Sequence, residues 1–283
     1  MSRIFEALRR MERESRPPDA GSPHPTTPTG LPNIGIQEPV DPIGVRSAMM
    51  EGRATSRLVA LTDPTTLGAE KFRSLATRLE NLRRERELKS LQITSSIVNE
   101  GKTLVSANLA ITLAKECAAK VLLVEGDLRR PALSSQLGLT ELTGLRQWWD
   151  GQDLGMAQFV YRLNQWPLFF LAAGGPWEQP SHFLQSGRFA EAFLSLTSGF
   201  DWILVDSTPM SPTADANLWS RLVDGTLLVV REGVAPVKAL KKGLQALDNP
   251  KLVGIVLNEA SDIDRTYYEN QHYTLQEKEQ HKQ

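Results

Sequence analysis

The chain of 283 residues has one cysteine, few histidines and no excess of charge of either sign. Because Cys117 stands alone, an intramolecular disulfide and any paired-cysteine metal or redox motif are excluded, as befits a reducing compartment. The four histidines lack the spacing of metal ligands. With 32 Lys and Arg against 33 Asp and Glu, the chain lacks the positive field that attracts nucleic-acid phosphates, so we expect no nucleic-acid partner.

Long apolar runs are also missing. No run approaches the roughly 20 residues that cross a bilayer, and the N-terminal residues lack the apolar core of a secretory signal. We therefore expect a cytoplasmic protein that reaches the inner face of the membrane only through a partner or a surface helix. The hydrophobic content of 41% is nevertheless enough to bury the core of one large α/β domain.

The first 55 residues divide into two segments of different composition. Residues 1–14 place Ile4, Phe5, Leu8 and Met11 on one side of a predicted amphipathic helix. This helix would dock on a partner, on a membrane surface or on its own domain. Residues 15–55 contain eight of the 17 prolines together with many Gly, Ser and Thr, a composition that predicts a flexible linker.

Residues 56–260 alternate between helical patterns and short runs that are apolar throughout. Strands that do not alternate with polar residues belong to a sheet that is covered on both faces. This pattern predicts an α/β domain with a mostly parallel, doubly wound sheet and helices on both faces. The predicted strands are Leu91–Thr94, Val121–Glu125, Leu168–Ala172, Trp202–Asp206, Gly225–Arg231 and Leu252–Asn258. Residues 261–283 are polar and predict a loose tail.

A candidate phosphate-binding loop runs from Thr94 to Thr103, between a predicted strand and a predicted helix. In such a loop the backbone N–H groups and the lysine face phosphates, and the hydroxyl after the lysine binds Mg²⁺, which assigns these roles to Lys102 and Thr103. Ser96 stands where the usual pattern has its first glycine, and Asn99 is a residue type that tolerates positive φ. The alternative is a helix that begins with Gly-Lys-Thr by chance.

Acidic residues end two of the predicted strands. Glu125 and Asp127 follow one strand, and Asp206 ends another. Ligands of open α/β sheets bind at the carboxyl edge, where a carboxylate can bind Mg²⁺ or orient an attacking group. Taken alone, each could equally be a helix cap or a turn residue, but the upstream loop favours a metal site.

Together these residues resemble the ATPase domain of the bacterial tyrosine kinases of capsule and exopolysaccharide systems, the BY-kinases. The resemblance covers residues 65 to 260 in collinear order and implies a P-loop NTPase fold, related to that of partition-type ATPases. Its motifs are Ile93–Thr103, Asn108–Ala110, Val121–Pro131, Ala173–Gly175, Phe183–Ser186, Asp201–Pro209, Asp215–Ala216, Asp224–Arg231 and Gly254–Asn258.

The resemblance implies a role for each candidate residue. ATP and Mg²⁺ would be the cofactors, and Mg²⁺ would bind to Thr103, Asp127 and Asp206. Glu125 would receive the proton of the tyrosine hydroxyl or support the metal, so that Lys102, Glu125, Asp127 and Asp206 form the catalytic set. The nucleotide would contact Asn99, Glu100, Gly101, Lys102, Thr103, Leu104 and, at the adenine, Asn258.

Three of the four tyrosines, Tyr267, Tyr268 and Tyr273, lie in the tail. Family members phosphorylate tail tyrosines in trans within a ring, so the resemblance implies that these are phosphoacceptors and that the chain is a homo-oligomer. It also implies a transmembrane chain-length-control protein as activator. The alternative for the tail is a small aromatic patch that packs on the domain.

The chain departs from the family pattern at four places. Val98-Asn99 replaces Pro-Gly, Glu125 replaces an aspartate, Ala76 replaces the last arginine of the oligomerisation helix, and the tyrosine cluster is thin. These departures leave two alternatives to kinase activity. One is an ATP-dependent switch like the partition and division-site ATPases, although Thr94–Glu100 lacks their extra lysine. The other is a nucleotide-bound scaffold for polysaccharide export.

Overall fold

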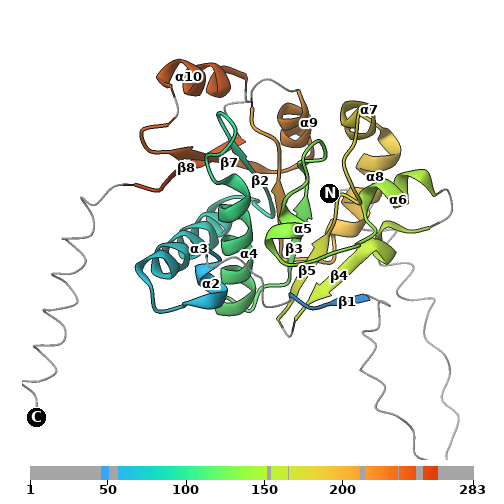
Figure 1. Ribbon diagram of the computed structural model, residues 1–283, viewed down its shortest axis with the longest axis horizontal. Helices are drawn as coiled ribbons and strands as arrows, with labels where there is room; N and C mark the ends of the chain where they lie inside the picture. The colour runs from blue at the N-terminus through green and yellow to red at the C-terminus, as the bar shows by residue number, and fades with distance from the viewer. Residues whose placement is uncertain are drawn as a thin grey trace, which may run out of the picture. The chain divides into compact units, whose positions relative to one another are not determined.

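The computed structural model describes residues 46–50, 57–151, 154–164, 166–210, 214–234, 236–246 and 251–260. These residues form an eight-stranded sheet with the strand order β1-β4-β5-β3-β6-β2-β7-β8, flanked by helices (Figure 1). The predicted amphipathic helix, most of the predicted linker and the tail with its three tyrosines lie outside the described residues.

Every predicted strand is present. The strands are β1 (Arg46–Ala48), β2 (Ser90–Ser95), β3 (Val121–Glu125), β4 (Val160–Leu163), β5 (Leu168–Leu171), β6 (Trp202–Asp206), β7 (Gly225–Arg231) and β8 (Leu252–Asn258). The helices are α2 (Val59–Thr62), α3 (Leu67–Glu85), α4 (Lys102–Glu116), α5 (Leu133–Gln136), α6 (Leu145–Asp150), η1 (Met156–Phe159), α7 (Pro180–Leu184), α8 (Gly187–Thr197), α9 (Asp215–Leu222) and α10 (Val237–Ala246).

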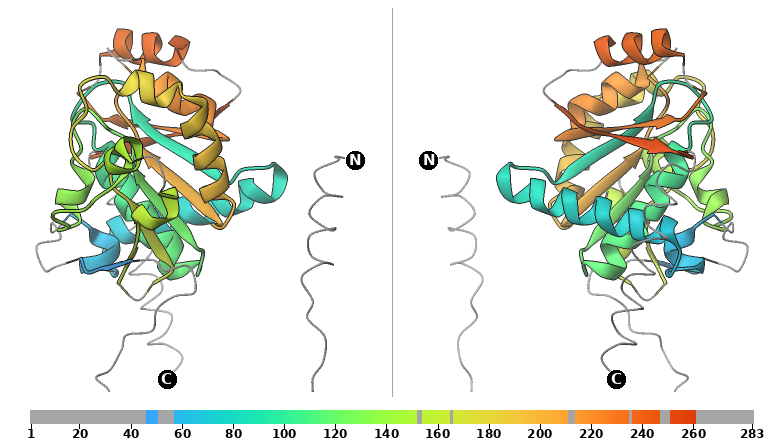
Figure 2. Two further views of the ribbon diagram at one scale, coloured as in Figure 1. Left: turned by 90° about the vertical axis from the view of Figure 1, so that its right-hand side faces the viewer. Right: turned by 90° about the vertical axis from the view of Figure 1, so that its left-hand side faces the viewer.

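Two apolar cores, one on each face of the sheet, explain why the central strands are apolar throughout. Leu123 of β3 packs into a core that includes side chains of α3 and α4, and its neighbour Leu122 packs into a core that includes side chains of α6 to α9. Successive strand residues face opposite sides of a sheet, so both must be apolar when both faces are covered. Helices lie on both faces in Figure 2, which confirms the predicted doubly wound fold.

The sheet is parallel except between β4 and β5, which pair in antiparallel register with Val160 opposite Leu171. The sequence analysis missed β4 and also β1, which pairs with β4 in parallel. Arg46–Ala48 falls inside the range that we predicted as linker, and these three residues belong to the edge of the sheet. β1 has only three residues, and Arg162 interrupts the apolar run in β4, whereas β5, also of four residues, is apolar throughout. Within the described ranges, no helix combines the length and apolar character needed to span a membrane.

Gln92 is a polar exception in the middle of β2, and it is fully buried. Its Nε2 donates to Ser207 Oγ at 2.7 Å and to the Ala216 carbonyl at 2.8 Å, and its Oε1 accepts from Thr226 Oγ1 at 3.3 Å. The amide therefore joins β2 to the segment after β6, to α9 and to β7. Because Ser207 directly follows Asp206, this network fixes the end of β6 that contributes to the candidate site.

We expect Gln92→Leu to lower the free energy of unfolding by about 2–4 kcal/mol, because it leaves the Ala216 carbonyl and the Thr226 hydroxyl buried without their Gln92 partner. The exposed Gln185→Leu is the matched control and should change it by less than about 0.5 kcal/mol. Urea unfolding monitored by tryptophan fluorescence measures both. Equal changes in the free energy of unfolding for the two variants would contradict a structural role for the Gln92 network.

Candidate functional site

A cleft of about 900 Å³ opens at the carboxyl edge of the sheet, where the loops after β2, β3, β6 and β7 meet. Its walls carry both basic and acidic side chains. They are formed by Arg57, Val98, Asn99, Gly101, Lys102, Thr103, Leu104, Asp127, Arg130, Ala132, Gln136, Pro209, Arg231 and Glu259. The cleft thus contains several of the residues that the sequence assigns to a nucleotide.

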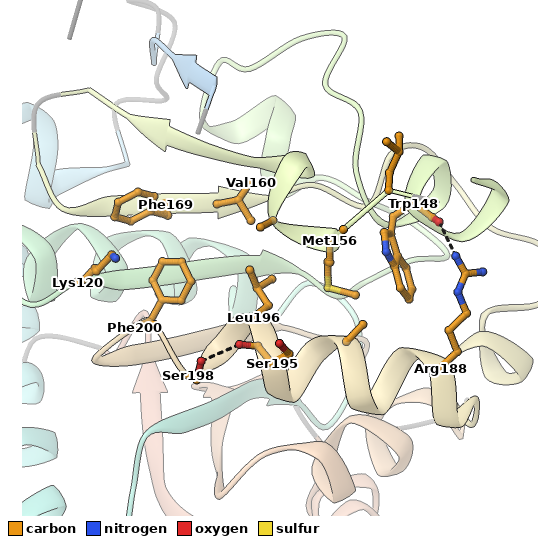
Figure 3. Close-up of a pocket in the computed structure, with 15 residues that line it drawn as sticks. Lys120, Trp148, Met156, Val160, Phe169, Arg188, Ser195, Leu196, Ser198 and Phe200 are labelled. Atoms are coloured by element: carbon orange, nitrogen blue, oxygen red, sulfur yellow. Dashed lines mark hydrogen bonds between the residues drawn. The ribbon is translucent and has the colours of Figure 1, made fainter. Parts of the chain in front are cut away.

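A second cavity of about 510 Å³ lies between α8, η1 and the sheet, and Figure 3 shows its largely apolar walls. Its charged lining residues are Lys120 and Arg188. The guanidinium of Arg188 donates to the carbonyls of Trp148, Trp149 and Gly151, and the ammonium of Lys120 lies over the rings of Phe169 and Phe200. With no carboxylate in its described lining, this cavity lacks groups for metal or proton-transfer chemistry.

The loop between β2 and α4 has the backbone shape of a phosphate-binding turn. Asn99 has φ of 64° and Gly101 has φ of 92°, so both lie in the left-handed region. The positive φ favours glycine at 101, and a Cβ atom there would stand 2.1 Å from Nδ2 of Asn258 and would displace that side chain. Gly101 is also the N-cap of α4, so the positive end of a 15-residue helix faces the cleft.

Hydrogen bonds of Glu100 hold this loop in its conformation. Its side chain is fully buried, with one oxygen accepting from Ser96 Oγ and Ile97 N at 2.8 Å and the other from Arg231 N at 3.3 Å. The Asn258 amide donates to the Glu100 carbonyl at 3.0 Å. Glu100 and Asn258 therefore join the loop to the ends of β7 and β8, and their contact with a nucleotide stays a prediction.

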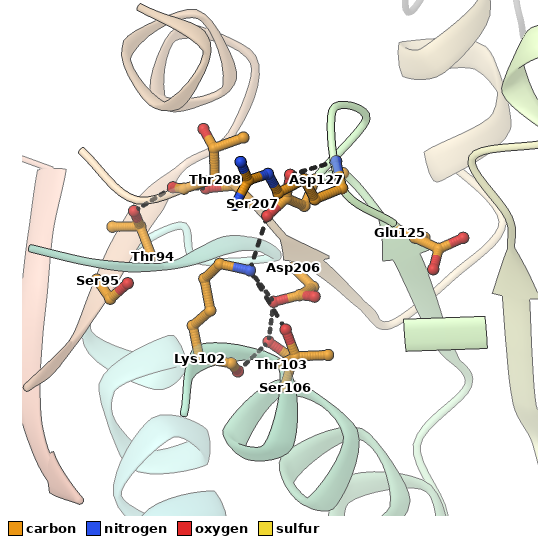
Figure 4. Close-up of polar contacts among 12 residues, drawn as sticks. Thr94, Ser95, Lys102, Thr103, Ser106, Glu125, Asp127, Asp206, Ser207 and Thr208 are labelled. Carbon is orange, nitrogen blue, oxygen red and sulfur yellow. Dashed lines mark hydrogen bonds and ion pairs between the residues drawn. The ribbon is translucent and has the colours of Figure 1, made fainter. Parts of the chain in front are cut away.

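Lys102 lies at the centre of a cluster of charges at the base of the cleft (Figure 4). Its Nζ is 3.0 Å from Asp127 Oδ2 and 3.8 Å from Asp206 Oδ1, and it donates to Thr103 Oγ1 at 3.3 Å. Burial alone would lower the pKa of Lys102, but the charges of Asp206 and Asp127 outweigh it and raise the pKa above its ordinary value. The lysine is therefore a fixed positive charge.

Asp206 is the deepest member of this cluster, at the end of β6 and 1% exposed. Ser106 Oγ lies 3.3 Å from its Oδ1, and Thr103 also donates to it. Burial raises the pKa of Asp206 to about 6, against the opposing effects of Lys102 and Thr103. Sequence reasoning missed Ser106, whose only signal is its place one helical turn after Lys102.

Asp127 and Glu125, two residues apart, face different surroundings. Asp127 lines the cleft and accepts the backbone N–H of Arg130 at 3.2 Å. Glu125 turns its carboxylate away from Lys102 (Figure 4), where it accepts from Ser134 N and Oγ at 2.9 and 2.7 Å and from Ala173 N at 3.1 Å. The structure brings Lys102, Thr103, Asp127 and Asp206 together, and it directs Glu125 towards α5.

The donor set of the cleft fits a magnesium nucleotide. Thr103 and the carboxylates of Asp127 and Asp206 are hard oxygen ligands, and Lys102 with the N-terminus of α4 attracts phosphate. No cluster of three or more His, Cys, Asp or Glu side chains suited to a metal occurs among the described residues. Mg²⁺ usually binds through one or two carboxylates together with substrate phosphates, and Asp127 and Asp206 provide two carboxylates beside the proposed phosphate site.

The raised pKa of Asp206 predicts how the nucleotide-free chain responds to pH. The pKa of Asp206 is about 6 in the folded chain, against an ordinary aspartate value of 3.8 in the unfolded chain. Between these two pH values the folded chain binds more protons than the unfolded chain, so the contribution of Asp206 to stability falls as pH rises. We expect Asp206→Asn to gain about 2 kcal/mol of unfolding free energy relative to the wild type between pH 4.5 and 7.5. Urea unfolding at several pH values measures this gain, and Asp150→Asn at an exposed position controls for the lost charge. If the difference in unfolding free energy between Asp206→Asn and the wild type did not change with pH, the raised pKa of Asp206 would be contradicted.

Comparisons with known proteins agree with this geometry. No protein-family model matches the chain. The chain is 30% identical over 208 residues to the tyrosine-protein kinase YwqD of Bacillus subtilis, a match that covers 73% of this chain and 87% of YwqD. It is 31% identical over 209 residues to the putative tyrosine-protein kinase CapB of Staphylococcus aureus, covering 72% of this chain and 90% of CapB.

Solved structures show the same relationship. The chimerical protein CapA2B2 is 25% identical with a TM-score of 0.66, over 77% of this chain and 93% of that one. The kinase domain of the Escherichia coli tyrosine kinase ETK is 26% identical with a TM-score of 0.61, over 72% and 82%. The cell division ATPase MinD of Pyrococcus furiosus is 26% identical with a TM-score of 0.51, over 62% and 74%. With the phosphate-binding loop and the acidic strand ends in place, the chain belongs to the bacterial tyrosine-protein kinase family.

Proposed function

We propose that this protein is an ATP-dependent protein-tyrosine kinase that phosphorylates tyrosines of its own kind. The observation that carries the proposal is the contact of Lys102 with Asp127 at 3.0 Å, at the mouth of a phosphate-binding loop. Transfer of a phosphoryl group requires a cation at the phosphates and a carboxylate near the acceptor hydroxyl, and this pair provides both. Relatives that are named tyrosine kinases support the choice of acceptor.

Each residue of the cluster has a task in this reaction. Lys102 and the N–H groups at the start of α4 bind the β- and γ-phosphates of ATP and orient them. Thr103 and Asp206 bind Mg²⁺, and Ser106 and the Gln92 network keep Asp206 in place. When bound, Mg²⁺ neutralises charge on the phosphate oxygens. Asn99 and Leu104 line the cleft beside the loop, where they contact the nucleotide.

Asp127, rather than Glu125, is the better candidate to accept the proton of the tyrosine hydroxyl. A proton acceptor must come within hydrogen-bond distance of the reacting group. Asp127 lines the cleft, whereas the Glu125 oxygens accept three hydrogen bonds from Ser134 and Ala173. We therefore assign Glu125 to positioning: it joins the start of α5 and the end of β5 to the loop that carries Asp127.

Tyr267, Tyr268 and Tyr273 are the acceptors that we propose. A relative that is named a succinoglycan biosynthesis transport protein supports activity in an exopolysaccharide system. We propose a transmembrane chain-length-control protein as the activator. Helix α3 gives little support to the proposed homo-oligomer, because it lacks the last arginine of the family's oligomerisation helix. Arg73 pairs with Glu70 and donates to the Pro64 carbonyl, and Ala76 is buried, so an arginine would not fit at 76.

The second candidate function is an ATP-dependent switch without kinase activity. The likeness to MinD favours it, because that protein shares the fold and is named a cell division ATPase. The CapA2B2 chimera and the ETK kinase domain match more of the chain with higher TM-scores, and the phosphate-binding loop lacks the extra lysine expected of such switches. The two functions differ in whether phosphate from ATP remains on the protein.

We expect intact mass to increase by one or more phosphates when the full chain is incubated with Mg·ATP. Lys102→Met should abolish the increase, because the variant loses the charge that binds the phosphates. Changing Tyr267, Tyr268 and Tyr273 together to Phe should abolish the increase but leave ATP binding intact.

Two outcomes would contradict the proposal. Hydrolysis of ATP without any bound phosphate would support the switch. Phosphate on the triple Phe variant would move the acceptor to the remaining tyrosine, Tyr161, or to another residue type. Where the chain alone shows neither reaction, the same assay with a cytoplasmic fragment of the membrane activator decides between a dormant and an absent activity.

A comparison of Asp127→Asn with Glu125→Gln separates the two acidic residues. We expect Asp127→Asn to lower kcat about a hundredfold or more, because the amide cannot accept the tyrosine proton. Glu125→Gln should lower kcat less than about tenfold and should mainly lower thermal stability, since the amide loses acceptors for buried donors. Initial rates of phosphate transfer and melting temperatures measure both effects. The reverse order of the two rates would restore Glu125 as the proton acceptor.

A further inference from the structure

Two arginines on the cleft wall have no task in the reaction as proposed so far. Of the four basic residues that line the cleft, Lys102 contacts the carboxylates of the cluster and Arg231 pairs with Glu259. Arg57 and Arg130 are both exposed, and neither guanidinium forms an ion pair or hydrogen bond within the described part of the chain. A cleft that contains two unpaired guanidinium groups attracts negative charge beyond the phosphates.

The backbone of each arginine is nevertheless anchored to the site. Asn108 of α4 donates to the Arg57 carbonyl at 3.2 Å and accepts the Ala60 N–H at 3.1 Å, while Leu58 is fully buried. The N–H of Arg130 donates to Asp127 at 3.2 Å. Both side chains therefore start from fixed points, one next to α2 and one beside the proposed proton acceptor.

The proposed acceptor segment carries the complementary charge. Asp262 and Asp264 precede the Tyr267-Tyr268 pair and Glu269 follows it, with Arg265 as the single basic residue among residues 262–269. A carboxylate next to the acceptor tyrosine would meet a guanidinium as the hydroxyl approaches Asp127. Planar guanidinium groups bind carboxylates in a paired geometry, so they add orientation as well as attraction.

The geometry points to Arg57 and Arg130 as specificity residues that select a tyrosine flanked by acidic residues, here the tail of a second copy of the chain. This inference rests on the proposed kinase function and adds a substrate class to it. The two arginines act on the peptide, and they leave the binding of Mg·ATP to the loop and the Lys102 cluster.

Peptides with the sequence of residues 260–275 test the inference with the full-length chain as enzyme. A second peptide replaces Asp262, Asp264 and Glu269 by Asn, Asn and Gln, and a third replaces all three by Lys. We expect the apparent KM to rise about five- to tenfold for the neutral peptide and further for the lysine peptide, with kcat changed less. Equal KM values for all three peptides would overturn the inference. Phosphorylation of none of them would instead count against the proposed function.

Charge reversal supplies the matched test on the enzyme. Arg57→Glu combined with Arg130→Glu should raise the KM for the acidic peptide about tenfold or more and should lower it for the lysine peptide. The KM for ATP, measured by hydrolysis without peptide, should stay within twofold. Arg84→Glu, at an exposed position on α3, is the control and should change neither KM. A raised KM for ATP in the double variant would assign the arginines to the nucleotide and overturn the inference.

Discussion

The site depends on a buried ammonium group that two carboxylates neutralise. Lys102 and Asp206 are both largely removed from water, and burial of either charge alone would cost several kcal/mol. The cluster is tolerable because Asp127 and Asp206 approach Lys102 from the ends of two neighbouring strands, β3 and β6, which pair in register with Glu125 opposite Asp206. Parallel pairing of these strands therefore puts Asp127 at 3.0 Å and Asp206 at 3.8 Å from the Lys102 ammonium group, and the surrounding polar groups keep each partner in its place.

Two buried polar side chains, Gln92 of β2 and Glu100 of the phosphate-binding loop, maintain that arrangement. Gln92 bonds to Ser207 beside Asp206, and Glu100 ties the phosphate-binding loop to the N–H of Arg231. Both side chains are fully buried. The nitrogen and the oxygen of the Gln92 amide both form hydrogen bonds, and so do both oxygens of the Glu100 carboxylate. Buried polar groups of this kind add little net stability, but they penalise any arrangement that leaves them unpaired. They therefore specify one conformation for the loop and one for the end of β6.

The sequence predicted six of the eight strands, because most of these runs are apolar and so record burial on two faces of a sheet. It also located Lys102, Thr103, Asp127 and Asp206, because the residue types required at a phosphate and metal site are few. It missed β1, which has three residues, and β4, in which Arg162 interrupts the apolar run. It could not show that Glu125 faces Ser134 while Asp127 faces the cleft, since side-chain direction at a strand end depends on the turn that follows. Nor could it show the hydrogen bonds by which Glu100 and Asn258 join the loop to the ends of β7 and β8.

The contact between Lys102 and Asp127 also bears on the order of events in the proposed reaction. Asp127 is 3.0 Å from Lys102, so its carboxylate is partly neutralised before ATP arrives. Phosphates that bind at the start of α4 compete for the same ammonium group, and their greater charge favours the exchange. Asp127 would then be released from Lys102 beside the proposed position of the incoming hydroxyl. In the proposed reaction one contact between a lysine and an aspartate is thus replaced by two contacts, Lys102 with the phosphates and Asp127 with the tyrosine hydroxyl.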